Sequence, residues 1–218
     1  MADKKNKIKY NKFICEFYNE LNEKNKAFSD LIFLCIGTDR LTGDCFGPLV
    51  GDKLKSNINN ITMNARVYGS LEEPIIQSNV NSKINEIYIK YDNPCIVAID
   101  AALSTEENIG KIIVTNNSLK LGKGLQKNIA QIGNISIKGV IGKKRKSRKK
   151  NMEILQNTSL NIVMNMASIV SNGIMEVLQE EYNFIWDLLY KCPQFGKNLY
   201  KPEVRVGRYI WILVIWRI

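Results

Sequence analysis

The sequence predicts an α/β protein, a three-layer α/β/α sandwich with a mostly parallel or mixed sheet. Two observations predict this fold. Short apolar runs of the kind buried on both faces of a parallel sheet recur along the chain, the first at residues 31–36. Segments with apolar residues at helical spacing follow these runs, and right-handed crossovers then leave few arrangements other than one sheet with helices on both faces.

The predicted elements alternate from the first apolar run onward. Strands are expected, in chain order, at residues 31–36, 65–68, 95–99, 111–115 and 135–141. Helices are expected at residues 47–55, 74–90 and 152–179. Before the first strand, Phe13, Phe17 and Leu21 recur at helical spacing, which predicts an amphipathic helix over residues 10–26 that packs as a lid or edge.

The chain divides into three parts. With 218 residues, 45% of them hydrophobic, it can bury one substantial core. We expect a basic N-terminal segment with the amphipathic helix at 1–29, an α/β domain at 30–180 and an atypical apolar tail at 181–218. The tail's longest apolar run, 209–216, is too short to span a bilayer, which needs about 20 residues. Without a leading apolar segment, we expect a cytoplasmic protein with no membrane partner.

The net charge of +10 is local to two segments. Residues 143–150 contain seven basic residues, and residues 1–12 contain five lysines and one aspartate. The rest of the chain has 19 basic and 20 acidic residues, a net charge of −1. The basic run is expected to be a solvated loop within residues 142–151. Nucleic-acid binding through it stays an alternative, which the lack of interleaved aromatic residues disfavours.

Two aspartates are the candidate catalytic residues. Asp44 follows the first predicted strand in a loop with glycines at both ends, and Asp100 directly follows the third. Ligands of open α/β sheets bind at the carboxyl ends of the strands, so both carboxylates are expected at one edge. Two neighbouring carboxylates cannot both ionise cheaply, so one can act as an acid while the other activates a water.

The absence of histidine narrows the possible chemistry. Ser-His-Asp and Cys-His mechanisms are excluded, and so is the common imidazole metal ligand. The five cysteines include no C-x-x-C pair, and Cys45 has no imidazole to activate it. We therefore expect no metal and no cofactor.

Further residues near the two aspartates are candidates for binding a substrate. They are Thr38, Asp39, Arg40, Thr42, Gly43 and Glu72. Structural alternatives stay open: Asp44 as a helix N-cap, Asp100 as a cap on the next turn, Asp39 with Arg40 as an exposed ion pair, and Glu72 as a first-turn residue favoured by the helix dipole.

Several motifs resemble those of the YyaC family of sporulation proteins. They are CIGTDRLTGDCFGPLVG at 35–51, YGSLEEP at 68–74, VAIDA at 97–101, GKGL at 122–125, IGNISIKGV at 132–140 and LQNT at 155–158. The first motif is long and specific, and the resemblance covers about residues 31–178. That family is similar to the germination protease of spores and, more distantly, to hydrogenase maturation endopeptidases.

The resemblance implies a peptidase-like α/β/α domain of the phosphorylase/hydrolase-like kind, with Asp44 and Asp100 catalytic. In the maturation enzymes the matching carboxylates hold a metal together with a histidine, which this chain lacks, so a metal-free site is favoured. The resemblance implies an endopeptidase that acts on small spore proteins in the sporulating cell or spore. Self-association into a homo-oligomer is a further expectation. The alternative is a non-catalytic sporulation protein that binds a peptide or small ligand in the same cleft.

Overall fold

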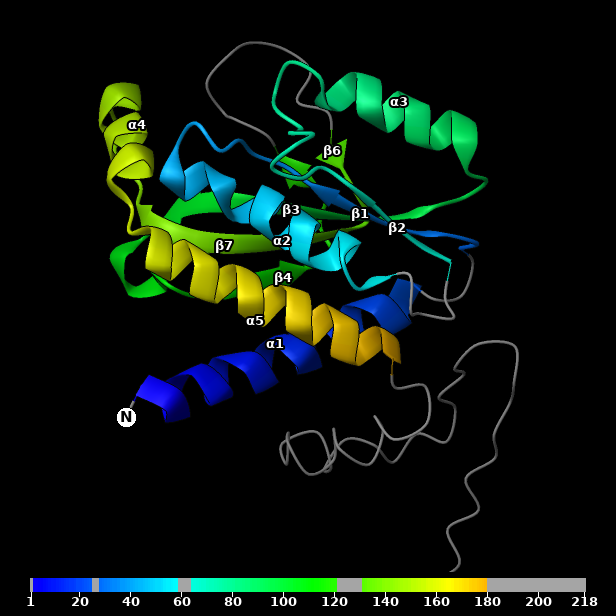
Figure 1. Ribbon diagram of the computed structural model, residues 1–218, viewed down its shortest axis with the longest axis horizontal. Coiled ribbons are helices and arrows are strands. Elements are labelled where there is room, and N and C mark those ends of the chain that lie inside the picture. Colours follow the sequence, from blue (N-terminus) through cyan, green and yellow to red (C-terminus); the bar gives the residue numbers. More distant parts are fainter. Residues whose placement is uncertain (1, 25–27, 59–63, 121–130, 180–218) are drawn as a thin grey trace, which may run out of the picture.

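The computed structural model describes residues 2–24, 28–58, 64–120 and 131–179 (Figure 1). A five-stranded sheet has the order β2-β1-β3-β7-β4. Its strands are β1 (Leu31–Cys35), β2 (Ala65–Tyr68), β3 (Cys95–Ser104), β4 (Ile112–Thr115) and β7 (Ile135–Lys143). The first four in spatial order pair in parallel, and β4 lies antiparallel at the edge. In a separate two-stranded sheet, β5 (Leu119–Lys120) pairs antiparallel with β6 (Gln131–Ile132).

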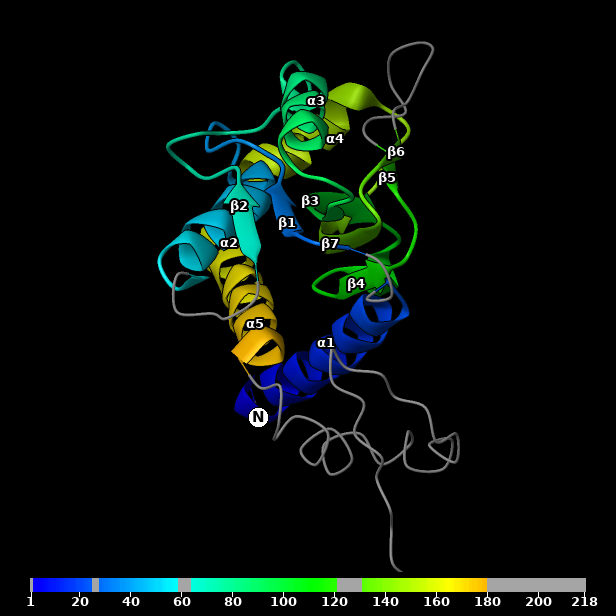
Figure 2. The same ribbon diagram turned by 90° about the vertical axis from the view of Figure 1, so that its right-hand side faces the viewer.

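Helices cover both faces of this sheet. One face packs against α1 (Ala2–Lys24), α2 (Phe46–Lys55) and α5 (Leu160–Gln179), and the other against α3 (Val80–Lys90) (Figures 1 and 2). Alternate residues of β3 enter the two cores, as expected for a strand buried on both faces: Val97 packs on the α2 side and Ala98 on the α3 side. The predicted three-layer sandwich with a mixed sheet is thus confirmed.

Two strands run further than the apolar pattern predicts. β3 continues to Ser104 and β7 to Lys143, because the two strands pair with each other up to that point. The pairing shifts register between Ala102 and Leu103 and then continues. The expectation that Asp100 directly follows a strand is therefore wrong: Asp100 lies inside β3, and a run of apolar residues underestimates a strand whose outer half is less buried.

Two helix predictions need correction. The helix expected at 74–90 begins only at Val80, because Ile75 is extended and forms a parallel bridge with Ile36 at the end of β1. The helix expected at 152–179 is two helices, α4 (Arg148–Asn157) and α5, separated at Thr158. Thr158 is extended, and its hydroxyl donates to the carbonyl of Ile154, which ends α4.

Half of the basic run lies in regular secondary structure. It begins at the end of β7 and enters the first turn of α4, so the expected loop at 142–151 shortens to residues 144–147. Its side chains from Lys144 to Lys150 are exposed, as predicted for a solvated charged segment.

The N-terminal helix belongs to the same hydrophobic core as the sheet. The rings of Phe13 and Phe17 stack with centroids 5.8 Å apart, and Phe17 lies 6.4 Å from Phe33 of β1. Lys9 Nζ donates to the carbonyl of Gly110 at 2.8 Å, beside the edge strand β4. Residues 122–125 and the tail at 181–218 lie outside the described residues. Among the described helices, none is both long and apolar enough to cross a membrane.

Candidate active site

The candidate site lies where the order of the strands reverses. The chain passes from β1 to β2 on one side of β1 and returns to β3 on the other side. Crevices for ligands form at such points, outside the carboxyl ends of the strands. The last pair between β1 and β3 joins Cys35 to Ile99, so Asp100 is the first residue of β3 beyond the end of β1.

A glycine turn after β1 brings Asp44 back to this point. Gly37 has a φ of 139°, and a Cβ there would lie 2.0 Å from the backbone oxygen of Asp44. The N–H of Gly37 donates to the carbonyl of Ile75 at 2.8 Å, and the N–H of Thr38 donates to the carbonyl of Asp44 at 3.2 Å. The chain therefore folds over the end of β1 before the short 3-10 helix η1 (Thr42–Cys45) and α2.

Glycines allow α2 to pack directly on the sheet. A Cβ at Gly47 would lie 2.1 Å from the carbonyl oxygen of Ile36. At the end of β2, Gly69 has a φ of 91°, and a Cβ there would lie 2.0 Å from the carbonyl oxygen of Cys35. Much of the long motif at 35–51 is thus required for the close approach of backbones, which in turn positions Asp44.

The two aspartates interact electrostatically. Burial, and next the charge of Asp44, raise the pKa of Asp100 to about 8, while the backbone N–H of Ala101 and the charge of Lys138 oppose this rise. Burial also raises the pKa of Asp44, and the backbone N–H of Thr38 partly offsets it. Both side chains are half-buried in the folded chain. With a pKa of about 8, Asp100 therefore holds a proton near neutral pH, beside the carboxyl group of Asp44.

Lys138 is a residue of this site that the sequence prediction missed. It lies opposite Asp100 in the register between β3 and β7, so the two side chains share a face of the sheet. The available signal was the polar alternation of Ser136 and Lys138 in an otherwise apolar strand. Ser136 is buried and its hydroxyl lies 2.9 Å from that of Thr115, whereas the charge of Lys138 acts on Asp100.

Three of the predicted substrate-binding residues lie in the turn before Asp44. The Thr38 hydroxyl donates to the carboxylate of Asp39 at 3.3 Å and accepts from the N–H of Arg40 at 3.3 Å. Asp39 and Arg40 are exposed, and Asp39 is paired with Thr38 rather than with Arg40. The alternative of an exposed ion pair between Asp39 and Arg40 is therefore not supported.

The other predicted binding residues differ in their surroundings. Gly43 is buried, and a Cβ there would lie 2.4 Å from Cδ1 of Ile141 and 3.1 Å from the backbone of Leu155, which gives it a packing role. The carbonyl of Thr42 accepts from the thiol of Cys45 at 2.9 Å. Glu72 is exposed in the turn after β2. β1 lies between β2 and β3, the strand that contains Asp100. Their contact with a substrate stays a prediction.

The capping alternatives for the two aspartates do not hold. The N-cap of α2 is Cys45, and no side chain makes a capping hydrogen bond there. Leu41 likewise precedes η1 without a side-chain cap. Asp100 lies inside β3 and begins no turn. Neither carboxylate is therefore explained by the ends of helices.

The donor set does not fit a metal centre of the histidine-containing kind. Within the part of the chain that the structure describes, no group of three or more Asp, Glu, Cys or His side chains is placed to hold a metal ion. Burial raises the pKa of the Cys45 thiol, which disfavours the thiolate. The chemistry available at this site is that of two carboxylates and an amine.

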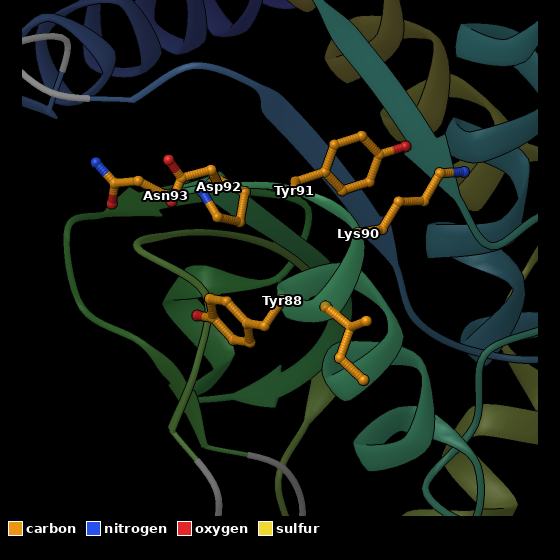
Figure 3. A pocket seen from close by; sticks show the side chains of 7 residues that line it. Tyr88, Lys90, Tyr91, Asp92 and Asn93 are labelled. Carbon is orange, nitrogen blue, oxygen red and sulfur yellow. The ribbon is translucent and has the colours of Figure 1, made fainter.

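A pocket elsewhere on the surface is separate from this site. It is lined by residues 88–94, between the end of α3 and the start of β3 (Figure 3). In it Lys90 Nζ lies 5.4 Å from the centre of the Tyr91 ring. β3 runs away from this pocket toward Asp100, so the pocket lies at the amino end of the strand and takes no part in the carboxylate site.

The sequence profile of the family described as "Protein of unknown function (DUF1256)" matches residues 1–173 of the chain. The chain belongs to this family. A relative of this chain, named "Uncharacterized protein YyaC" in Bacillus subtilis (strain 168), is 38% identical over 151 residues, 69% of this chain and 71% of the relative. The predicted resemblance to the YyaC family is thereby confirmed.

Solved structures with a similar arrangement share little sequence with this DUF1256 chain. A [NiFe] hydrogenase maturation protease, HycI, from Thermococcus kodakarensis KOD1 is 18% identical, with a TM-score of 0.46 over 72% of this chain and 97% of that protein. An uncharacterized protein from Wolinella succinogenes is 16% identical, with a TM-score of 0.40 over 68% and 96% of the two chains.

Proposed function

We propose that this protein is an endopeptidase in which Asp44 and Asp100 hold and activate the water that hydrolyses a peptide bond. The observation that supports the proposal is that two carboxyl groups interact at the strand-order reversal, where burial and the charge of Asp44 raise the pKa of Asp100 to about 8. A protonated acid beside an ionised base is what general acid–base hydrolysis requires.

The two aspartates have different roles in this mechanism. Asp44 accepts a proton from the water as the water oxygen bonds to the carbonyl carbon of the substrate. Asp100 then donates its proton to the amide nitrogen, and the C–N bond breaks to release a carboxylic acid and an amine. The proton on Asp44 passes to Asp100 and restores the starting state, so no external acid or base is consumed.

The neighbouring residues would position the substrate. Thr38, Asp39, Arg40 and Thr42 lie in the turn beside Asp44, and Lys138 offers a cation for the oxyanion that forms during attack. The YyaC resemblance suggests small spore proteins as substrates, in the cytoplasm of the sporulating cell or spore.

Substitution of each aspartate by asparagine tests the proposal. Asp44→Asn and Asp100→Asn should each reduce cleavage of purified small spore proteins by about 100-fold or more, measured by mass spectrometry of the products. Asp92→Asn is the matched control, because Asp92 is an exposed carboxylate at the amino end of β3. Asparagine variants that cleave as well as the unmodified protein would refute the mechanism.

A binding measurement separates the non-catalytic alternative. If the unmodified protein binds spore-protein peptides and releases them intact over long incubation, the cleft is a binding site and the endopeptidase proposal is wrong. If peptides are cleaved and both asparagine variants still bind them, the carboxylates act in the chemical step and not in binding.

A further inference from the structure

Six exposed cations lie together at the carboxyl end of the sheet, and we call them the basic rim. They are Lys144, Arg145, Lys146, Arg148, Lys149 and Lys150. The neighbouring Lys143 pairs with Glu106 at 2.6 Å, but within the described residues none of the six forms a salt bridge. The basic rim is therefore a concentrated positive surface without salt bridges in the described chain, although the charge of Arg145 acts on the carboxylate of Glu106.

The basic rim is unfavourable for folding. Arg148, Lys149 and Lys150 occupy the first turn of α4, where the helix dipole favours acidic side chains and disfavours cations. Their mutual repulsion adds to this cost. The Ser147 hydroxyl caps the helix by accepting from the N–H of Lys150, so the cations are not needed to begin it. An external anionic partner would offset the repulsion that remains among the cations of the basic rim in the folded protein.

The position of α4 connects the basic rim to the carboxylate site. β7 ends at the same edge of the sheet as β3, and α4 follows it. Within α4, the backbone of Leu155 packs against Gly43, the neighbour of Asp44. Figure 1 shows α4 beside the start of α2, beyond that end of the sheet. Leu155 follows Arg148 by seven positions in α4, so the two residues are about 10 Å apart along the helix axis.

The composition of the surrounding surface favours a polypeptide over a nucleic acid. Exposed apolar side chains follow the basic rim on α4 and α5: Met152, Leu160, Ile162 and Met164 are each between 40% and 51% exposed. Residues 143–164 include no aromatic side chain on which a base could stack. A surface of cations next to aliphatic side chains is complementary to a peptide that carries both acidic and apolar residues.

From these observations we infer that the basic rim binds an acidic segment of the protein substrate beside the bond to be cleaved. The inference rests on the proposed endopeptidase function of Asp44 and Asp100. An extended peptide advances about 3.3 Å per residue. A distance of about 10 Å along α4 therefore places the preferred acidic residues roughly three to five positions from the scissile bond.

A binding experiment tests the rim itself. The probe is a fluorescein-labelled glutamate-rich peptide, with a glutamine-rich peptide of equal length as its neutral counterpart, and the readout is fluorescence anisotropy. The triple variant Lys146→Gln, Lys149→Gln, Lys150→Gln should bind the acidic probe about tenfold more weakly at low salt. The control triple variant Lys7→Gln, Lys53→Gln, Lys90→Gln removes equal charge elsewhere and should bind as the unmodified protein does.

Two outcomes of this experiment would overturn the inference. Equal loss of binding in both triple variants would show only an effect of net charge. Tighter binding of a DNA oligonucleotide than of the acidic peptide, with a larger loss for DNA in the rim variant, would assign the surface to nucleic acid.

A cleavage experiment distinguishes this inference from the proposed function. Two substrates share one cleavable sequence, and one of them carries glutamates three to five positions away. The glutamate substrate should have the lower KM, and the rim variant should lose this advantage while kcat is unchanged. Equal KM values with cleavage intact would overturn the rim inference alone. Binding of the acidic probe without any cleavage would overturn the endopeptidase proposal and leave the rim as a docking surface.

Discussion

Lys138 of β7 lies directly beside Asp100 of β3 in the parallel register, and its charge opposes the burial and the Asp44 charge that raise the pKa of Asp100 to about 8. The protonation of Asp100 is therefore set by burial and the charge of Asp44 on one side and by the backbone N–H of Ala101 and the charge of Lys138 on the other. Each of the two charges can be removed by a single substitution, which makes the site testable.

The rate of peptide cleavage should depend on pH in a bell-shaped manner. The acidic limb follows ionisation of Asp44, whose pKa is raised above the ordinary value of 3.8. The alkaline limb follows loss of the proton from Asp100, with a pKa of about 8. A plot of kcat/KM against pH for a peptide substrate measures both limbs. A rate that stays level well above pH 8 would show that Asp100 is not the acid.

Replacing Lys138 should move the alkaline limb upward. Removal of its charge in Lys138→Met lets the pKa of Asp100 rise, because the burial and the Asp44 charge then act unopposed by a cation. We expect an alkaline shift of about one pH unit or less. Lys138→Arg keeps the charge and serves as the control. A limb that stays in place in Lys138→Met would mean that the two side chains do not interact in solution.

The Asp100→Asn variant should gain stability over the unmodified protein as pH rises. The raised pKa means that the folded state holds a proton which the unfolded state releases above about 3.8. This contribution to stability is present below 3.8 and is lost as the pH rises through about 8. The full pKa shift would correspond to about 6 kcal/mol, but Asp100 is partly exposed and solvent screens it, so we expect a smaller relative gain of about 2 kcal/mol. Urea unfolding of both proteins at acidic and alkaline pH measures it, and a difference independent of pH would contradict the raised pKa.

Gly37→Ala should be strongly destabilising. A Cβ at this position meets the backbone oxygen of Asp44 at 2.0 Å, and the φ of 139° is already unfavourable for alanine. We expect a loss of about 3 kcal/mol or more in the free energy of unfolding. Gly110→Ala is the control, because Gly110 also has a positive φ but its nearest neighbour is the Lys9 Nζ at 3.4 Å. Similar losses for both variants would show that backbone strain alone, and not contact with Asp44, decides the cost.

Phe17→Ala should destabilise the whole sheet domain. Phe17 of α1 is fully buried between Phe13 and Phe33, so its loss should cost about 3 to 5 kcal/mol. Ile8→Ala, on the same helix but 62% exposed, should change stability by less than about 0.5 kcal/mol. Urea unfolding curves followed by circular dichroism and by a second signal that does not come from tryptophan should shift together. A separate early transition for α1 would show instead that the helix unfolds by itself.

The strands near the centre of the sheet could be predicted because their residues are buried on both faces. β1 differs from its predicted bounds by one residue, since Ile36 forms only a bridge. The edge strand β2 matches its predicted bounds, although most of its residues are not fully buried. The outer half of β3 could not be read from an apolar run, because cross-strand pairing with β7 maintains it although its residues are only partly buried. β7 extends two residues beyond its predicted end for the same pairing. The break between α4 and α5 was hidden for a related reason: both helices carry apolar residues at compatible spacing, and only Thr158 changes the direction of the chain.

From local pattern alone, the chain specifies alternating strands and helices, and with them the edge of the sheet at which Asp44 and Asp100 must meet. Strand polarity suffices for that, because parallel strands end at one edge. The pairing of Asp100 with Lys138 and the packing of α4 against Gly43 depend on contacts between distant segments. Register and helix packing are set by the combined fit of many side chains, so only the tertiary structure decided the charge balance of the site and the position of the basic rim.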